Sequence, residues 1–137
     1  MQAFLYEAGR LTTKTNYLIP VLARAFAGQT GCEAGTLPRV LAFTGSGGKT
    51  SLMGRLAWEA RQDGKKVLIA TTTHMARPNQ YATLTDDAQA IIRQLQQEGV
   101  VIAGLPAGEK KISFIGQAAY DRACAAADLA LVEADGS

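Results

Sequence analysis

The sequence predicts a parallel α/β fold. Four apolar runs, at residues 39–44, 66–71, 100–103 and 129–133, alternate with segments of helical periodicity. Such runs are typical of strands covered on both faces of a parallel sheet, and alternation of strands with helices favours that architecture. Parallel sheets bind ligands at the carboxyl ends of their strands. The polar segments at the ends of three of these runs, 39–44, 66–71 and 129–133, are therefore candidates for function.

Residues 1–38 are predicted to form a separate N-terminal unit, in which an extra helix is followed by a loop. Apolar residues recur at helical spacing from Leu18 to Phe26, and Gly28 ends the pattern. Residues 28–38 are rich in glycine and are predicted to be a loop. Residues 39–137 form the predicted core. Because the chain ends inside its last motif, we expect this core to continue beyond Ser137.

Between the strands of the core, the spacing of apolar residues predicts helices and loops in alternation. Leu52, Leu56 and Ala60 give the first helix an apolar face. The second helix is expected to begin near Asp86, with two acidic residues in its first turn, and to end at Gly99. The full expectation is helices at residues 49–62, 86–99 and 117–127, a loop at 72–85 and a short strand at 112–115.

The most informative segment lies between the first strand and the first helix and reads Gly45-Ser-Gly-Gly-Lys-Thr50. Glycines let backbone N–H groups approach phosphate oxygens, and the helix N-terminus adds donors and partial positive charge. Lys49 can reach the outer phosphates, and the hydroxyl of Thr50 can coordinate a phosphate-bound Mg²⁺. The predicted nucleotide-binding residues are Gly45, Ser46, Gly47, Gly48, Lys49, Thr50 and Ser51.

This segment makes the predicted fold class P-loop NTPase-like, a mostly parallel sheet flanked by helices. The match to G-x-x-x-x-G-K-[ST] is incomplete, because Phe43 stands where the first glycine belongs. The shortened loop is equally similar to the G-T-x-G-K-T loop of Mur-type ligases. The expected ligands are Mg²⁺ and ATP or GTP, and the sequence leaves the choice of nucleotide open.

A second motif follows the last strand, where Glu133 and Asp135 stand at alternate positions. One carboxylate could hold Mg²⁺ through water while the other orients a nucleophile. The same residues are also similar to the D-x-x-G switch of GTPase-like proteins, in which the Gly N–H meets the γ-phosphate. The sequence leaves both interpretations open.

A third candidate group follows the strand at 66–71. Thr71 is interpreted as strand-forming, whereas Thr73 and His74 stand at the strand end and are predicted to function there. His74 is a candidate general acid/base or phosphate ligand, and Arg77 is either an anion contact or a surface residue. The predicted catalytic residues are Lys49, His74, Glu133 and Asp135, and the predicted metal ligands are Thr50, Thr73, Glu133 and Asp135.

Composition limits the possible partners and compartments. The formal net charge of +2 over 137 residues is too small to suggest nucleic acid, and no run is apolar enough to span a bilayer. The N-terminus has no basic region followed by a long apolar stretch, as a signal peptide would. We therefore expect a cytoplasmic protein with no nucleic-acid or membrane partner.

Three segments together, residues 44–50, 70–75 and 127–137, resemble the YqeC family, whose members are accessory proteins for selenium-dependent molybdenum hydroxylases. The resemblance implies nucleotide binding in the service of selenium or molybdenum cofactor maturation. It implies a molybdenum hydroxylase or its cofactor as partner. Carried over by motif, the glycines with Lys49 and Thr50 bind phosphate and Mg²⁺, and Thr73, His74, Glu133 and Asp135 line the reacting end.

The function predicted from these motifs is Mg²⁺-dependent binding of a nucleoside triphosphate with hydrolysis, phosphoryl transfer or nucleotidyl transfer. A second hypothesis is a nucleotide-gated chaperone or cofactor-delivery protein, in which hydrolysis acts as a timer. The sequence therefore leaves open whether the protein is primarily an enzyme. A third reading is a Mur-like ligase fragment, which rests on the short phosphate loop.

Overall fold

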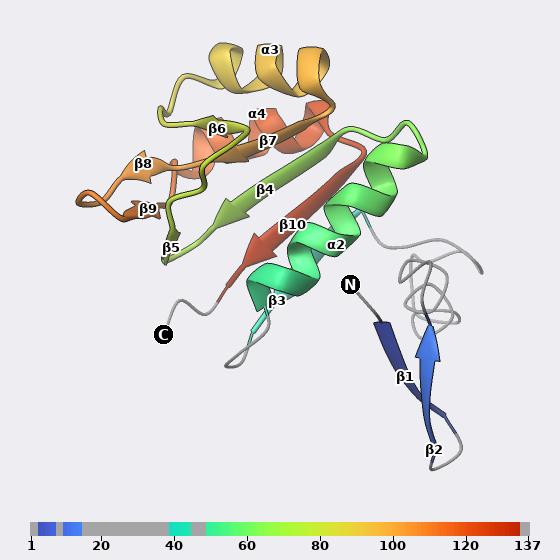
Figure 1. The fold of residues 1–137 in the computed structure, drawn as a ribbon. Coiled ribbons are helices and arrows are strands. Elements are labelled where there is room, and N and C mark those ends of the chain that lie inside the picture. The colour runs from blue at the N-terminus through green and yellow to red at the C-terminus, as the bar shows by residue number, and fades with distance from the viewer. Residues whose placement is uncertain (1–2, 8–9, 15–38, 45–48, 135–137) are drawn as a thin grey trace. The chain divides into compact units, whose positions relative to one another are not determined.

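The computed structural model describes residues 3–7, 10–14, 39–44 and 49–134 (Figure 1). The chain divides into two compact units, residues 1–38 and residues 39–137. In the described part of the chain, no helix is long and apolar enough to cross a membrane.

The N-terminal unit contains a β-hairpin that the sequence analysis did not assign. β1 (Ala3–Glu7) pairs antiparallel with β2 (Arg10–Lys14). The register places Ala3 opposite Lys14 and Glu7 opposite Arg10. The helix and loop predicted between residues 16 and 38 lie outside the described residues.

The second unit is built on a five-stranded sheet in the order β3-β10-β4-β7-β6. All four pairings in this sheet are parallel, which confirms the predicted α/β class. β10 is last in the chain yet lies between β3 and β4. The strands are β3 (Val40–Phe43), β4 (Val67–Thr71), β6 (Ala82–Thr83), β7 (Val100–Ala103) and β10 (Leu129–Glu133).

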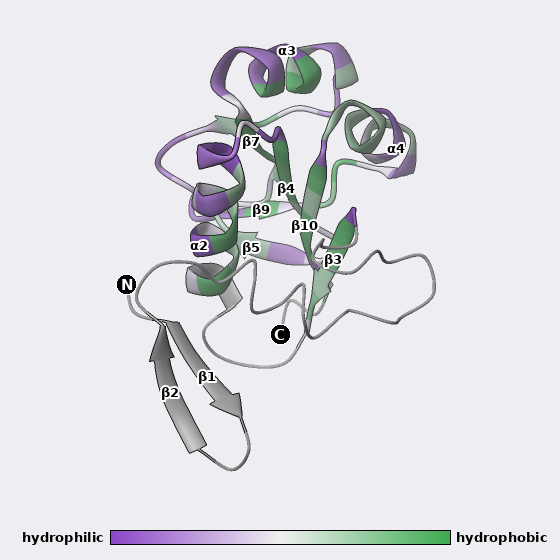
Figure 2. Cartoon of the chain, turned by 90° about the vertical axis from the view of Figure 1, so that its right-hand side faces the viewer, coloured by the Kyte–Doolittle hydropathy of each residue, from purple (hydrophilic) through white to green (hydrophobic). Residues whose placement is uncertain are grey.

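Helices cover both faces of this sheet. They are α2 (Lys49–Gln62), α3 (Ala88–Glu98) and α4 (Gln117–Ala126), close to the predicted ranges. Figure 2 shows α2 on one side of the sheet and α4 on the other, with hydrophobic residues along the strands between them. α2 packs on β10 and β4, whereas α3 packs on β7 and against α4.

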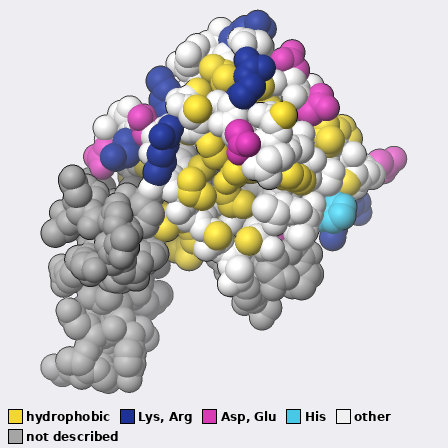
Figure 3. Space-filling model, turned by 180° about the vertical axis from the view of Figure 1, so that it is seen from behind, with side chains coloured by type: hydrophobic (Ala, Val, Ile, Leu, Met, Phe, Trp, Pro, Cys, Tyr) yellow, Lys and Arg dark blue, Asp and Glu magenta, His cyan; other side chains and the backbone are white. Residues whose placement is uncertain are grey.

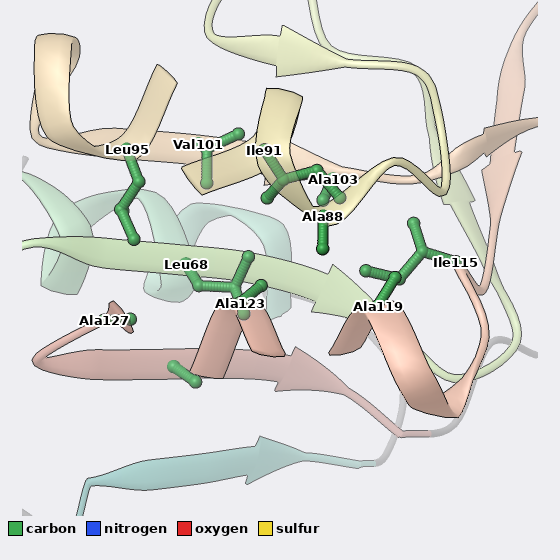
Figure 4. Close-up of a cluster of buried hydrophobic side chains, with 11 residues drawn as sticks. Leu68, Ala88, Ile91, Leu95, Val101, Ala103, Ile115, Ala119, Ala123 and Ala127 are labelled. Carbon is green, nitrogen blue, oxygen red and sulfur yellow. The ribbon is translucent and has the colours of Figure 1, made fainter. Parts of the chain in front are cut away.

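The main core cluster fills the space between the sheet and the pair α3 and α4 (Figure 4). Leu68, Val101 and Ala130 contribute from three strands, and Ile91 and Leu95 contribute from α3. The α4 side of the cluster consists largely of alanines, which let that helix approach closely. Burying each leucine or isoleucine contributes about 1.5–3 kcal/mol, so this cluster fixes the sheet against α3 and α4.

A small antiparallel sheet in the order β5-β9-β8 extends the fold. It consists of β5 (His74–Ala76), β8 (Leu105–Pro106) and β9 (Lys111–Ser113). The prediction of a continuous loop at 72–85 is therefore wrong, because β5 and β6 both lie within it. Strands of two or three residues are too short to show a period, and their partners lie far away in the sequence.

The start of α3 also differs from the prediction. The helix begins at Ala88, and Asp87 is its N-cap, whose carboxylate accepts a hydrogen bond from the N–H of Gln89 at 3.0 Å. The two aspartates therefore precede the first turn. The predicted end is confirmed, because Gly99 adopts a left-handed conformation with φ 78° and its N–H donates to the carbonyl of Leu95.

Asp87→Ala should lower the free energy of unfolding by about 1 kcal/mol, since it removes the cap that satisfies a helical N–H. Asp86→Ala is the matched control, because Asp86 is an exposed neighbour outside the cap. Urea unfolding followed by circular dichroism measures both variants. Equal losses in the two variants would contradict the assignment of Asp87 as the cap.

Tyr120 on α4 is the basis of a pH-dependence prediction. Burial, followed by its hydrogen bond with Cys124, raises the pKa of Tyr120 from 10.0 to about 12. Between these two values the unfolded chain releases a proton that the folded chain keeps, so stability should fall as pH rises from about 10 to 12. In Tyr120→Phe this fall should be smaller. Parallel stability curves for the two proteins across this interval would rule the effect out.

Candidate functional site

The candidate site lies where three neighbouring strands end. β10 pairs with β3 on one side and β4 on the other, and its last residue, Glu133, stands opposite both Phe43 and Thr71. The chain leaves β3 through the glycine-rich segment and enters α2 at Lys49. The strand that leads to the predicted phosphate loop is thus hydrogen-bonded to the strand that ends in a carboxylate.

Glu133 is buried, with 7% of its surface exposed, at the end of β10. Side chains alternate along a strand. Because Ala130 belongs to the cluster beneath α3 and α4, Glu133 lies on the opposite face, which α2 covers. A carboxylate taken out of water is costly unless it is paired. Its burial on the face of α2, the helix that follows the glycine-rich segment, excludes the interpretation of Glu133 as part of a solvent-exposed turn.

The threonine segment is attached to β10 through the backbone of Glu133. The carbonyl of Glu133 accepts hydrogen bonds from the N–H of Thr72 at 2.9 Å and from the hydroxyl of Thr71 at 3.2 Å. The hydroxyl of Thr71 also accepts from the N–H of Thr73 at 3.1 Å. Thr71 is fully buried. Its hydroxyl therefore fixes the turn that carries Thr73 away from the sheet.

His74 lies at the start of β5, where it stands opposite Ser113 of β9. Its side chain is exposed, and Figure 3 shows the chain's single histidine, in cyan, on the surface. Thr73 is exposed as well. The structure thus places His74 in the small sheet and Glu133 in the main one. β10 ends and the turn toward β5 begins at the same edge of the main sheet, because the N–H of Thr72 donates to the carbonyl of Glu133.

Arg77 has a structural role in the described part of the chain. Its guanidinium donates to the carbonyl of Gly108 at 2.6 Å, and its backbone N–H donates to the carbonyl of Lys110 at 2.8 Å. These bonds hold the β8–β9 turn against β5. The sequence analysis interpreted Arg77 as either an anion contact or a surface residue. Neither interpretation included this contact with the β8–β9 turn.

The remaining predicted residues are described only in part. Ser51 is an exposed residue of the first turn of α2. For Lys49 and Thr50 the structure describes the helical backbone, which starts α2 at the carboxyl edge of β3. Gly45, Ser46, Gly47, Gly48 and Asp135 lie outside the described residues.

Sequence reasoning missed an ion pair on α2. The Nε atom of Arg55 lies 3.0 Å from Oε2 of Glu59, and Glu59 is only 1% exposed. The guanidinium of Arg55 also lies 5.0 Å from the ring centroid of Trp58. The i, i+4 spacing of opposite charges was the available signal. The burial of Glu59 on the packed face of α2 is shown only by the tertiary structure.

Among the described residues at this edge, the buried carboxylate is that of Glu133. Within the described residues, no group of three or more His, Cys, Asp and Glu side chains is placed to hold a metal ion. Mg²⁺ usually keeps several waters and takes one or two carboxylates together with substrate phosphates. Glu133 is a ligand of this chemical type.

The fold and the site define a parallel α/β protein whose candidate site lies at the carboxyl edge of its sheet. A family model described as YqeC protein matches residues 41–137. The chain belongs to the YqeC family, as its motifs suggested.

The curated protein described as "Uncharacterized protein YqeC" from Escherichia coli (strain K12) is 48% identical to this chain over 44 residues. The match covers 32% of this chain and 17% of that protein, whose description names no activity. No solved structure matches the chain.

Thr71→Val should lower the free energy of unfolding by about 1–3 kcal/mol, because it removes a buried hydroxyl that both donates and accepts. Thr72→Val is the matched control, since the Thr72 side chain is exposed and its hydroxyl contact with Glu133 is longer, at 3.4 Å. Chemical denaturation measures both. A loss in Thr72→Val as large as that in Thr71→Val would argue against the structural role of Thr71.

Proposed function

We propose that this protein binds a nucleoside triphosphate with Mg²⁺ and hydrolyses it, or transfers its phosphoryl or nucleotidyl group. One observation carries the proposal. β3, which leads into Gly45–Thr50, is paired directly with β10, which ends at the buried Glu133. This pairing supports a site in which a glycine-rich helix start and a carboxylate act on the same ligand.

The chain's own groups would divide the work as follows. The backbone N–H groups of residues 45–48 and the N-terminus of α2 would bind the phosphates and stabilise developing negative charge. The ammonium of Lys49 would contact the outer phosphates. Mg²⁺, when bound, would offset phosphate charge, with Thr50 and Glu133 as its protein ligands. Asp135, with Glu133, would position the attacking nucleophile.

Residues of the threonine segment would complete this edge. Thr73 would approach the bound metal through water, and His74 would act as a general acid/base or contact a phosphate. The exposure of both side chains leaves them accessible to a ligand. The short turn after Thr71 brings them to the edge where β10 ends, because the N–H of Thr72 bonds to the carbonyl of Glu133.

We extend the proposal to the maturation of a selenium- or molybdenum-dependent hydroxylase, in the cytoplasm. This part rests on the family resemblance of the three motifs, since the E. coli relative has no assigned activity. Slow nucleotide turnover that accelerates on addition of a client hydroxylase would favour the nucleotide-gated reading. Fast turnover with a small acceptor would favour transfer.

Lys49→Ala should weaken Mg²⁺-dependent binding of ATP or GTP by about 10- to 100-fold, the range expected when a charged hydrogen-bond partner is removed. Calorimetric titration with and without Mg²⁺ measures the affinity. Lys65→Ala is the control, because Lys65 is an exposed lysine just beyond the other end of α2. Wild-type affinity in Lys49→Ala would refute nucleotide binding by this loop.

The role of Asp135 is tested in the same assay by a change that preserves shape. Asp135→Asn should reduce phosphate release far more than it reduces nucleotide affinity, because it removes the charge that positions the nucleophile. Unchanged release would exclude Asp135 from the reaction and leave Glu133 as the carboxylate to test.

A further inference from the structure

A cavity of about 370 Å³ lies on the α2 side of the sheet, apart from the carboxyl edge. Its walls are one stripe of α2 (Gly54, Ala57, Trp58 and Arg61), Tyr81 before β6, and Ile102 of β7. The volume falls within the range of small-molecule sites in proteins. The stripe begins five residues after Lys49, so the cavity runs along the middle and the C-terminal part of the helix.

The cavity arises because the helices cover the two faces of the sheet to different extents. α2 packs on β10 and β4, while α3 and α4 lie on the opposite face. Ile69 of β4 and Ile102 of β7 are paired and point to the α2 side, and Ile102 remains partly exposed. The space beside α2 (labelled in Figure 1) is therefore bounded by β4 and β7, and the residues from these strands that line it are apolar.

Two residues that are locally unfavourable, Gly54 and Tyr81, line this cavity. Gly54 occupies the interior of α2, where alanine is more stable. A Cβ added at Gly54 would have no atom within 4 Å in the described structure, so packing does not demand a glycine there. Tyr81 has φ 64°, a conformation that costs free energy for any residue with a side chain. Such costs are concentrated at functional sites.

Tyr81 is held in this conformation from two sides. The N–H of Ile102 donates to its carbonyl at 2.8 Å, and the guanidinium of Arg61 donates to its hydroxyl at 3.2 Å. The same guanidinium lies 5.0 Å from the centroid of the Tyr81 ring. The ring is thus a fixed wall of the cavity, and the cation beside it is partly buried.

The polar groups of the cavity set the charge of its ligand. The Arg61 guanidinium keeps further N–H donors beyond its bond to Tyr81, and none of the lining residues carries a carboxylate. Trp58 is 50% exposed and offers an aromatic surface to the cavity, and the guanidinium of Arg55, a second cation, lies 5.0 Å from its ring centroid. These features favour a flat ring with a negative charge and disfavour a cation.

We propose that this cavity binds a small planar aromatic molecule bearing an anionic group, with its ring against Trp58 and its anion toward Arg61. The site is separate from the phosphate site of the proposed function and does not depend on it. Gly54 leaves room for the ring, and Tyr81 forms a wall fixed by its hydrogen bond with Arg61.

The test follows the indole N–H signal of Trp58, the chain's single tryptophan, by NMR. The 137-residue chain is titrated with naphthalene-2-sulfonate and with naphthalen-2-ylmethylammonium, which share a ring and differ in charge. The sulfonate should saturate the signal and bind at least about tenfold more tightly than the ammonium, a difference of about 1.4 kcal/mol. No saturation by the sulfonate, or equal binding of both probes, would overturn the proposal.

Variants then connect binding to the cavity. Gly54→Phe should fill the space and weaken sulfonate binding at least about tenfold, whereas Gly54→Ala should keep it within about twofold. Arg61→Gln should abolish the preference for the sulfonate, and Arg93→Gln on the exposed side of α3 should not. Circular dichroism checks folding, and Gly54→Leu replaces Gly54→Phe if the latter unfolds. Wild-type affinity in the filled variant, or a Trp58 signal that shifts on diluting the protein alone, would refute the site.

Discussion

The position of β10 is the constraint on which the rest of this structure depends. β10 pairs in parallel with both β3 and β4, so the last described strand lies inside the sheet. Parallel neighbours need crossover connections, and the helices provide them. The pairing sets Glu133 opposite Phe43 and Thr71. Without it, the glycine-rich segment and the carboxylate would have no fixed relation, since they are separated by most of the core.

Different helices pack on the two faces of the sheet, and α2 contributes residues to both candidate sites. α3 and α4 close one face over a continuous cluster, while α2 packs mainly on β10 and β4 on the other. The first turn of α2 follows the glycine-rich segment that leaves β3 at the carboxyl edge, and β3 is paired with the strand that ends at Glu133. The later turns of α2, from Gly54 to Arg61, line the cavity next to β7. One helix therefore contributes to both candidate sites from different turns.

Polar residues near the carboxyl edge divide into those that build it and those that remain available. The hydroxyl of Thr71 is hydrogen-bonded to the backbone of Glu133 and Thr73, and the guanidinium of Arg77 is hydrogen-bonded to the carbonyl of Gly108. Thr73 and His74 remain exposed after the turn that these bonds hold. Residue type alone does not separate the two groups, because a threonine or an arginine serves equally well in either.

The sequence by itself determined the α/β class, the bounds of α2 and the end of α3 at Gly99, because apolar runs, helical periodicity and a left-handed glycine are local signals. It also marked Glu133 and the threonine segment as candidates. Tertiary structure alone decided that β10 enters between β3 and β4, that Thr71 is a structural hydroxyl, and that Gly54 and Tyr81 face one cavity. These depend on pairing and packing between distant segments, which no local period encodes.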